Sequence, residues 1–328
     1  MKRVLIALLV AIIYHAEAKA WPNMNMMVRR SPLETLLPKN VHTLTDCMHV
    51  TSEDGIFTYR KVRRSSSFNS ANGLHLVEME PAEQQVCGVY FMTDPDKIIE
   101  VEVEFSDVSC DLGGLLGFVD GWELNGEYFP NINDHELPLE QRVFEFCDKT
   151  SSNPFIRKTL RKRKFISNQN GAVFQYKIPY QGSFAISARY VHNPKPCNIM
   201  AEGVAPFYVL QNYGSSRNCT ITALFPAVVS ILALDVGVNK GSVNYDCDHQ
   251  NYFDKVIVGG SNGLDSSQMT KSAGICGTSE IKGPEQAIFC GVTSIRLESS
   301  GKHNNKVYVS LRQADENDMN LATAVCDL

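Results

Sequence analysis

Ten cysteines constrain the fold of this chain more than any other feature of its sequence. They are Cys47, Cys87, Cys110, Cys147, Cys197, Cys219, Cys247, Cys276, Cys290 and Cys326. Nowhere do two of them stand in a C-x-x-C pair, the close spacing that structural zinc sites use. An even number of cysteines in an exported protein predicts a disulfide framework, and neither a metal site nor a catalytic thiol is expected.

The first twenty residues predict export to an oxidising compartment. Lys2 and Arg3 precede an apolar run over residues 4–14, and the small-residue pattern A-E-A-K-A follows. This is the pattern of a secretory signal peptide, with cleavage expected after Ala18 or Ala20. We therefore expect a secreted, extracellular and soluble mature protein.

Three surface features bear on partners. Asn218 begins the only N-x-[S/T] sequon and predicts a glycan, with an unused sequon as the alternative. The formal net charge of −5 and the sequence pI of about 5.9 give no indication of a nucleic-acid partner. The basic run RKTLRKRK, residues 157–164, predicts a solvated loop, and a processing site or a polyanion patch is the alternative.

Strand patterns dominate the chain. Residues 98–108 alternate apolar and acidic side chains, as a half-buried strand does. The apolar run over residues 223–234 is shorter than a membrane helix and contains Pro226, so a buried strand is expected there. No window of a dozen residues has the apolar stripe of a helix. Short strands separated by Gly, Pro and Asn turns predict β-sandwich architecture. Other strand-like runs lie at residues 171–178, 182–191, 255–260, 293–300 and 305–313.

A weak internal repeat divides the chain into two halves. Each half contains a cysteine, a strand with a Gly-containing turn, a second cysteine and two more strands. The predicted organisation is a signal peptide (1–20), an N-terminal extension (21–45), a first domain (46–191), a linker (192–196) and a second domain (197–328). The repeat favours bridges within each half, although sequence alone does not fix connectivity. The expected pairs are Cys47–Cys87, Cys110–Cys147, Cys197–Cys219, Cys247–Cys276 and Cys290–Cys326.

Residues 118–139, FVDGWELNGEYFPNINDHELPL, gather acidic side chains and could suggest catalysis. Asp120-Gly121 and Asn125-Gly126 are typical hairpin-turn dipeptides, because glycine tolerates positive φ. Two catalytic carboxylates would need unequal surroundings on a concave wall, which adjacent turn residues rarely have. We interpret this cluster as turns.

Residues 259–263, GGSNG, match the nucleophile-elbow pattern G-x-S-x-G of hydrolases. That motif requires a strand, a sharp turn and a helix in a parallel sheet. The residues that follow have no apolar helical face, so the hydrolase interpretation is rejected. The chain is not predicted to be an enzyme, and no catalytic residue, metal or cofactor is expected.

Several long motifs in fixed order, together with the ten cysteines, resemble the corticotropin-releasing factor-binding protein family from about Cys47 onward. The motifs are VDGWELNGEYFP with DHELPL, NPFIRKTLRK, GLDSSQMT (263–270) and SSGKHNNKV (299–307). Each half also resembles the CUB domain. The resemblance implies an all-β fold of two disulfide-bonded, CUB-like, jelly-roll sandwiches in tandem. It also implies a secreted protein that captures helical peptide hormones of the corticotropin-releasing factor or diuretic-hormone type and limits their access to receptors.

The resemblance directs attention to the first cysteine. In the family, an Arg four residues before it and an Asp two residues after it are linked to ligand binding, but these places hold Thr43 and His49 here. Ligand preference or the set of contacts is therefore expected to differ. Acidic residues nearby are candidates to supply charge: Asp46, Glu53 and Asp54.

Some CUB domains bind calcium through an Asp six residues before the Asp-Gly turn. That place holds Gly114 in the first half, which has no ligating side chain, and Asp254 lies near the equivalent position of the second half. A calcium site is the rival interpretation of the acidic cluster, but the chain is not expected to hold one.

Exposed aromatic residues are the expected anchors for an amphipathic hormone, because they bury large areas at low entropic cost. Trp122 and Tyr128 are the candidates, whereas Phe129 is expected in the core. The alternative function is an extracellular CUB-type adhesion or scaffold module that binds a protein ligand. Neither nucleic acid nor a membrane is an expected partner.

Overall fold

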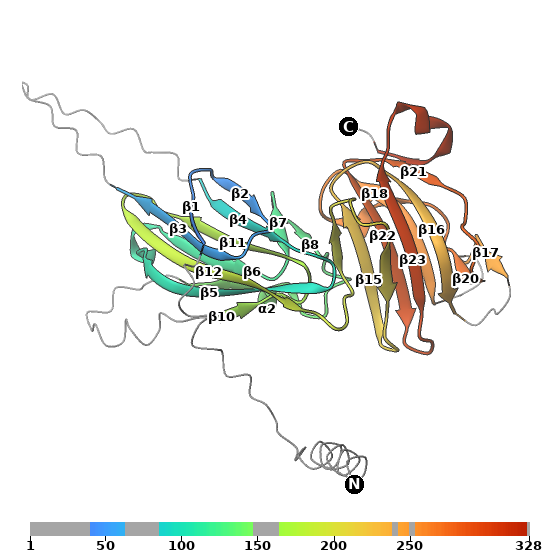
Figure 1. Cartoon of the computed structure of the whole chain (residues 1–328), viewed down its shortest axis with the longest axis horizontal. Helices are drawn as coiled ribbons and strands as arrows, with labels where there is room; N and C mark the ends of the chain where they lie inside the picture. The colour runs from blue at the N-terminus through green and yellow to red at the C-terminus, as the bar shows by residue number, and fades with distance from the viewer. Residues whose placement is uncertain (1–39, 63–84, 147–163, 238–241, 249–252, 327–328) are drawn as a thin grey trace, which may run out of the picture. The chain divides into compact units, whose positions relative to one another are not determined.

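A computed structural model describes residues 40–62, 85–146, 164–237, 242–248 and 253–326 (Figure 1). The predicted signal peptide, the rest of the segment before residue 40, residues 63–84, Cys147 and all of the basic run except Lys164 lie outside these residues. The described strands form two β-sandwiches, so the predicted all-β class is confirmed. Both sandwiches belong to one compact unit, residues 40–328.

The first sandwich contains two five-stranded sheets. The order of the first sheet is β1 (Val41–Thr43), β3 (Gly55–Lys61), β12 (Gly182–His192), β5 (Lys97–Asp107) and β10 (Lys164–Ile166). The order of the second sheet is β2 (Met48–Thr51), β4 (Cys87–Met92), β11 (Gly171–Lys177), β6 (Leu115–Val119) and β9 (Val143–Glu145).

The alternation predicted for residues 98–108 determines which face of β5 meets the core. Ile99, Val101 and Val103 are buried between the sheets, as period-two patterning requires. Glu100 is also buried, but it forms ion pairs with Lys164 of β10 and Arg189 of β12. A buried carboxylate needs such partners, because desolvating an unpaired charge is costly.

The second sandwich follows β12 without a long connection. The order of its first sheet is β13 (Ile199–Ala201), β15 (Ser216–Ala223), β22 (Val292–Ser300), β18 (Lys255–Ser261) and β19 (Thr270–Lys271). The path of its second sheet is β14 (Tyr208–Gln211), β23 (Lys306–Gln313), β16 (Ala227–Val236), β20 (Cys276–Ser279) and β17 (Val243–Asn244). The same sheet also contains β21 (Gln286–Phe289), which pairs with β16, and β24 (Ala322–Val325), which pairs with β21.

The internal repeat appears in the first sheet of each sandwich. In both, a short edge strand pairs in parallel with its neighbour, β1 with β3 and β13 with β15. The third strand then runs antiparallel, β12 against β3 and β22 against β15. The two halves therefore share the same order of parallel and antiparallel pairing in their first sheets.

The apolar run at residues 223–234 spans the end of one strand and most of the next: Ala223 ends β15, and residues 227–234 lie in β16, which begins directly after Pro226. Ala227, Val229 and Ile231 are buried in the core of the second sandwich. The predicted buried strand is therefore observed from residue 227 onward, whereas residues 224–226 connect β15 to β16. In the described part of the chain, no helix has the length and apolar character of a membrane span.

Four disulfides lie within the described residues, and each joins cysteines that are consecutive in the sequence. Cys110 is also disulfide-bonded, and its expected partner Cys147 lies outside the described residues. The four disulfides close loops of 22 to 40 residues. A disulfide typically stabilises a domain by about 2–4 kcal/mol, chiefly by restricting the unfolded chain. The four pairs are Cys47–Cys87, Cys197–Cys219, Cys247–Cys276 and Cys290–Cys326.

Candidate functional site

The residues at the family's two ligand positions lie on the edge strands of the two different sheets of the first sandwich. Thr43 ends β1 and is exposed, whereas His49 lies in β2 and is half-buried with its ring 6.0 Å from that of Phe57. The chain between them is short, and Cys47 within it is bonded to Cys87 of β4. The disulfide therefore fixes the start of β2 against β4 of its own sheet, whereas β1 pairs with β3 of the other sheet.

Apolar side chains point outward from the same strands. Val41 of β1 and Met48 and Val50 of β2 are each at least half exposed, with 63%, 50% and 54% of their surfaces accessible. Edge strands usually carry charged residues or prolines that prevent pairing with other chains. We call these residues of the two edge strands the β1–β2 edge: Val41, Thr43, Met48, His49 and Val50. The outward side chains of β1 and those of β2 belong to opposite sheets of the sandwich.

Carboxylates surround the β1–β2 edge. Asp46, Glu53 and Asp54 are all exposed. Burial raises the pKa of Tyr190, and Asp54 and Glu53 raise it further, while its hydroxyl donates to the Glu53 backbone oxygen at 3.0 Å. Burial also raises the pKa of Tyr176 to about 12, with contributions from Tyr59 and Asp46. The edge thus combines apolar side chains with a negative field.

The aromatic residues proposed as anchors are mostly not available to a ligand. Trp122 is only 5% exposed, and its indole N–H donates to the Phe91 backbone oxygen at 2.8 Å. Phe129 is buried, as expected, and Tyr128 is half-buried with a pKa raised by burial and by Glu123. The prediction of Trp122 as an exposed anchor is therefore wrong, because Trp122 packs in an apolar cluster with Met200 and Leu264.

The acidic cluster at residues 118–139 is only partly a set of turns. Asn125 and Gly126 have φ values of +55° and +83° and join β7 (Trp122–Leu124) to β8 (Glu127–Phe129), so the Asn-Gly hairpin turn is confirmed. Asp120 is not a hairpin-turn residue. β6 ends just before it and pairs with β9 and β11, not with β7.

Asp120 is instead the centre of a buried polar network. Its Oδ1 accepts hydrogen bonds from the backbone N–H of Asn168 (2.8 Å) and from the Gln169 side chain, and His135 Nε2 lies 3.2 Å from its Oδ2. Arg142 donates from Nε and Nη2 to the Asp120 backbone oxygen at 3.2 and 3.1 Å. Burial lowers the pKa of Arg142. These contacts hold Asp120, His135 and Arg142 together inside the first half of the chain.

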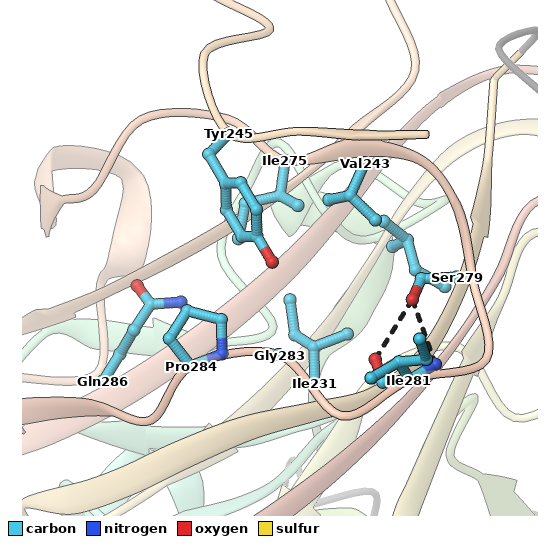
Figure 2. A pocket seen from close by; sticks show the side chains of 10 residues that line it. Ile231, Val243, Tyr245, Ile275, Ser279, Ile281, Gly283, Pro284 and Gln286 are labelled. Atoms are coloured by element: carbon cyan, nitrogen blue, oxygen red, sulfur yellow. Dashed lines mark hydrogen bonds between the residues drawn. The ribbon is translucent and has the colours of Figure 1, made fainter. Parts of the chain in front are cut away.

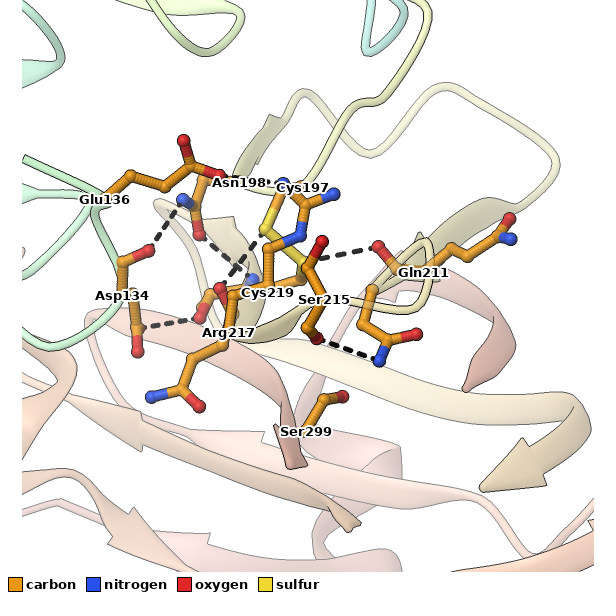
Figure 3. The surroundings of a disulfide bond; sticks show 12 residues. Asp134, Glu136, Cys197, Asn198, Gln211, Ser215, Arg217, Cys219 and Ser299 are labelled. Carbon is orange, nitrogen blue, oxygen red and sulfur yellow. Dashed lines mark hydrogen bonds and ion pairs between the residues drawn. A yellow bond between two sulfur atoms is a disulfide. The ribbon is translucent and has the colours of Figure 1, made fainter. Parts of the chain in front are cut away.

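Asp134 connects the segment after β8 to the second sandwich. Its Oδ2 accepts hydrogen bonds from Arg296 Nε and Nη2 (3.1 and 3.0 Å) and from Thr220 Oγ1 (2.7 Å). Its backbone oxygen accepts one from Asn198, beside the Cys197–Cys219 disulfide (Figure 3). These contacts hold the Asp134 carboxylate through Oδ2 against residues of the second sandwich.

The sequon residue lies in the same region. Asn218 of β15 is half-buried, and its Nδ2 donates to the Asn133 backbone oxygen at 3.2 Å. The neighbouring Arg217 forms an ion pair with Glu136 at 2.9 Å (Figure 3). A glycan on Asn218 would therefore be attached next to the contacts with Asn133 and Glu136.

The geometry supports neither a hydrolase nor a metal centre. Ser261 ends β18 and donates to the Gly263 backbone oxygen at 2.7 Å, and the next helical element is only the three-residue 3-10 turn η2 (Ser266–Gln268). Asp254 is buried and its Oδ1 accepts a hydrogen bond from the Ser300 N–H. Among the described residues, no three His, Cys, Asp or Glu side chains are grouped to hold a metal.

A pocket in the second sandwich is a site that sequence reasoning missed (Figure 2). β16 pairs with β21 through Ala227–Val229 and with β20 through Leu234–Val236, so the sheet is interrupted between them. The connecting residues 280–285 leave a shallow hollow of about 10 Å³ over the interruption. The sequence signal was a lone apolar residue, Ile281, in the polar turn SEIKGPE.

Comparison with known proteins matches both halves of the chain. Residues 57–192 match the corticotropin-releasing factor binding protein N-terminal domain, and residues 201–320 match the C-terminal domain. The corticotropin-releasing factor-binding protein of Ovis aries is 30% identical over 275 residues, covering 82% of this chain and 75% of that protein. The Homo sapiens protein of the same name is 29% identical over 263 residues, covering 78% and 77%.

Among solved structures, the CUB1-EGF-CUB2 domains of rat MASP-1 align with 82% of this chain and 100% of that chain, at 9% identity and a TM-score of 0.23. The family matched by both halves consists of binding proteins and not of enzymes. The two domain matches and the relative at 30% identity confirm the resemblance noted from the sequence motifs. This chain belongs to the corticotropin-releasing factor-binding protein family.

Proposed function

We propose that this chain sequesters peptide hormones of the corticotropin-releasing factor or diuretic-hormone type outside the cell and limits their access to receptors. The observation that carries the proposal is the match of both halves to one family, whose relatives are named for binding corticotropin-releasing factor. Because the match spans 82% of the chain, the whole fold is shared and not one module alone.

The β1–β2 edge supports this proposal. An amphipathic peptide needs apolar contacts next to matching charge, and β2 offers exposed Met48 and Val50, with the exposed carboxylates of Asp46, Glu53 and Asp54 before and after it in the chain. A ligand with basic residues flanking an apolar stripe is the complementary partner. Thr43 and His49 take the places of the family's Arg and Asp, so this chain would recognise its hormone with a different set of charges.

Export is part of the same proposal. Disulfides persist in oxidising compartments and are rare in the cytosol, and four are present among the described residues. We expect secretion with signal cleavage after Ala18 or Ala20 and a glycan on Asn218. N-terminal sequencing of the secreted protein and its mobility before and after N-glycosidase treatment test both expectations.

A receptor assay tests the proposed function. Cells that express a corticotropin-releasing factor receptor are stimulated with the hormone in the presence of increasing amounts of the purified protein. Sequestration predicts a rightward shift of the dose–response curve that scales with the concentration of protein, with an unchanged maximum. An unchanged curve contradicts the proposal. Recovery of a large glycoprotein instead of a peptide from body fluid would favour an adhesion or scaffold role.

A further inference from the structure

The free edge of β2 presents backbone groups as well as apolar side chains. β2 is the outermost strand of its sheet, and among the described residues no strand pairs with its other side (Figure 1). It runs parallel to β4, with Met48 opposite Gly88 and Val50 opposite Tyr90. Gly88 donates its N–H to the Cys47 backbone oxygen at 2.8 Å, so the hydrogen-bonding pattern of the pair is set where β2 begins.

This pattern decides which backbone groups of β2 are open to another chain. In a parallel pair, the residues that bond to the neighbouring strand alternate along the chain. Because the Cys47 oxygen bonds to β4, His49 and Thr51 also direct their backbone groups toward β4. The N–H and C=O groups of Met48 and Val50 therefore point away from β4, and two donors and two acceptors are open for a further strand.

The sequence of β2 does not protect this edge. Natural edge strands often carry lysine, proline or a bulge that prevents pairing with other chains. β2 reads Met-His-Val-Thr and pairs with β4 without a shift in register, and 50% of the Met48 surface and 54% of the Val50 surface are exposed. An incoming strand would find backbone partners and apolar contacts at the same two residues. The length of four residues limits the contact to a short segment.

Carboxylates before and after β2 select the kind of partner. Asp46 precedes the strand, Glu53 and Asp54 follow it, and all three are exposed. Glu53 lies 3.7 Å from His42 Nδ1, and in the described part of the chain no lysine or arginine forms an ion pair with any of the three. A second copy of the chain, paired antiparallel through β2, would bring the carboxylates at the two ends together, and like charges placed opposite each other are destabilising. A partner segment that carries basic residues is favoured instead.

We propose that β2 binds the hormone by strand addition: an extended segment of the peptide pairs with the free edge of β2, with apolar residues at alternate positions and basic residues at its ends. Main-chain hydrogen bonds to Met48 and Val50 provide affinity, and alternate side chains of the segment contact the exposed side chains of the same two residues. This inference rests on the proposed function and assigns an extended conformation to the part of the hormone that contacts β2.

Proline substitution separates backbone pairing from side-chain contact. Val50→Pro removes an N–H that β4 does not use, so the ladder between β2 and β4 remains. Val50→Ala keeps the N–H and removes most of the side chain. Fluorescently labelled corticotropin-releasing factor is titrated with each protein and followed by anisotropy. Strand addition predicts a loss of affinity of about tenfold or more in Val50→Pro, the effect of a lost hydrogen bond, and a smaller loss in Val50→Ala.

A valine on the edge strand β14 of the second sandwich provides the matched control. Asn212 donates its N–H to the Asn305 backbone oxygen at 3.3 Å, directly after β14, and bonded and non-bonded pairs alternate along an antiparallel ladder. Val209, opposite Tyr308, is therefore a non-bonded position whose N–H points away from β23. Val209→Pro should leave the affinity for the hormone unchanged.

Hydrogen exchange followed by NMR measures the pairing in the unaltered protein. The backbone amides of Met48 and Val50 should exchange rapidly in the free protein and slowly once the hormone saturates it, because strand addition gives these amides an acceptor. The amide of His49 bonds to β4 in both states, so it should be protected throughout and serves as the internal control.

The outcomes separate the two proposals. New protection of the Met48 and Val50 amides, with affinity lost in Val50→Pro and kept in Val209→Pro, supports strand addition. If the unaltered protein binds the peptide while these amides stay unprotected, strand addition is overturned and the proposed function stands. Protection that appears without peptide, together with a dimer in sedimentation, would assign the edge to a second copy and also overturn it. If the unaltered protein does not bind the peptide at all, the proposed function fails, and this inference fails with it.

Discussion

Arg296 of β22 places Nε and Nη2 3.1 and 3.0 Å from one oxygen of Asp134, and both side chains are buried. The two residues are 162 positions apart in the sequence and belong to different halves of the chain. The fold is stable only when both partners of such a buried pair are present, because a lone buried charge is strongly destabilising.

Removing the carboxylate of Asp134 should therefore be costly. Asp134→Ala leaves Arg296 buried without its anion, and we expect a loss of about 3–5 kcal/mol in the free energy of unfolding. Chemical denaturation measures this loss. Glu136→Ala is the matched control. Glu136 lies two residues from Asp134 and also forms an ion pair, with Arg217, but its side chain is 64% exposed. Its removal should lower the free energy of unfolding by no more than about 1 kcal/mol. Equal effects of the two variants would contradict the buried-pair account.

Gly121 should tolerate no side chain. Its φ is +118°, and a Cβ there would lie 2.0 Å from the Phe129 backbone oxygen. We expect Gly121→Ala to destabilise the protein by more than about 2 kcal/mol through strain and overlap. Gly126 has a φ of +83° and open space around it, so Gly126→Ala should cost only about 1 kcal/mol. Thermal unfolding of the two variants, side by side, separates the effect of steric overlap at Gly121 from the effect of positive φ alone at Gly126.

Asp318 should make stability depend on pH in the acid range. Hydrogen bonds from Arg312 lower the pKa of Asp318 to about 2, and the Asp315 N–H adds to the shift. Because the folded pKa lies below the unfolded one, this contribution is complete at neutral pH and is lost as pH falls toward 2. Asp318→Asn should therefore lower the melting temperature at pH 7 but not at pH 2. A difference between the two proteins that persists at pH 2 would argue against the shift.

A disulfide map should show only links within each half. Digestion without reduction, followed by mass spectrometry, is expected to recover the four pairs seen among the described residues and a fifth between Cys110 and Cys147. The loops closed by the four pairs span 22 to 40 residues, so each bridge restricts a local part of the unfolded chain. A peptide that links the first half to the second, or a free thiol, would contradict this framework.

Much of the fold was predictable because local signals and tertiary structure agree. The alternation in β5, the apolar run of β16 and the Asn125-Gly126 turn each specify one conformation by their own chemistry. Family motifs extended this reading to the whole chain. These features depend on short stretches of sequence, and local periodicity predicts such secondary structure well.

The site was harder to predict because it depends on contacts between distant residues. Asp120 looked like a turn residue, yet Asn168 and Gln169 convert it into a buried acceptor. Trp122 looked like an exposed anchor, yet Met200 and Leu264 join it in a buried cluster. The pocket at Ile281 arises from an interruption of strand pairing along β16, which no local pattern encodes.

Isothermal titration of the purified, oxidised protein with corticotropin-releasing factor tests the central claim most directly. A protein that withholds hormone from receptors must bind it tightly, and we predict a one-to-one complex with a Kd in the nanomolar range, roughly −12 kcal/mol. Absence of heat, or a Kd in the millimolar range, would contradict the account.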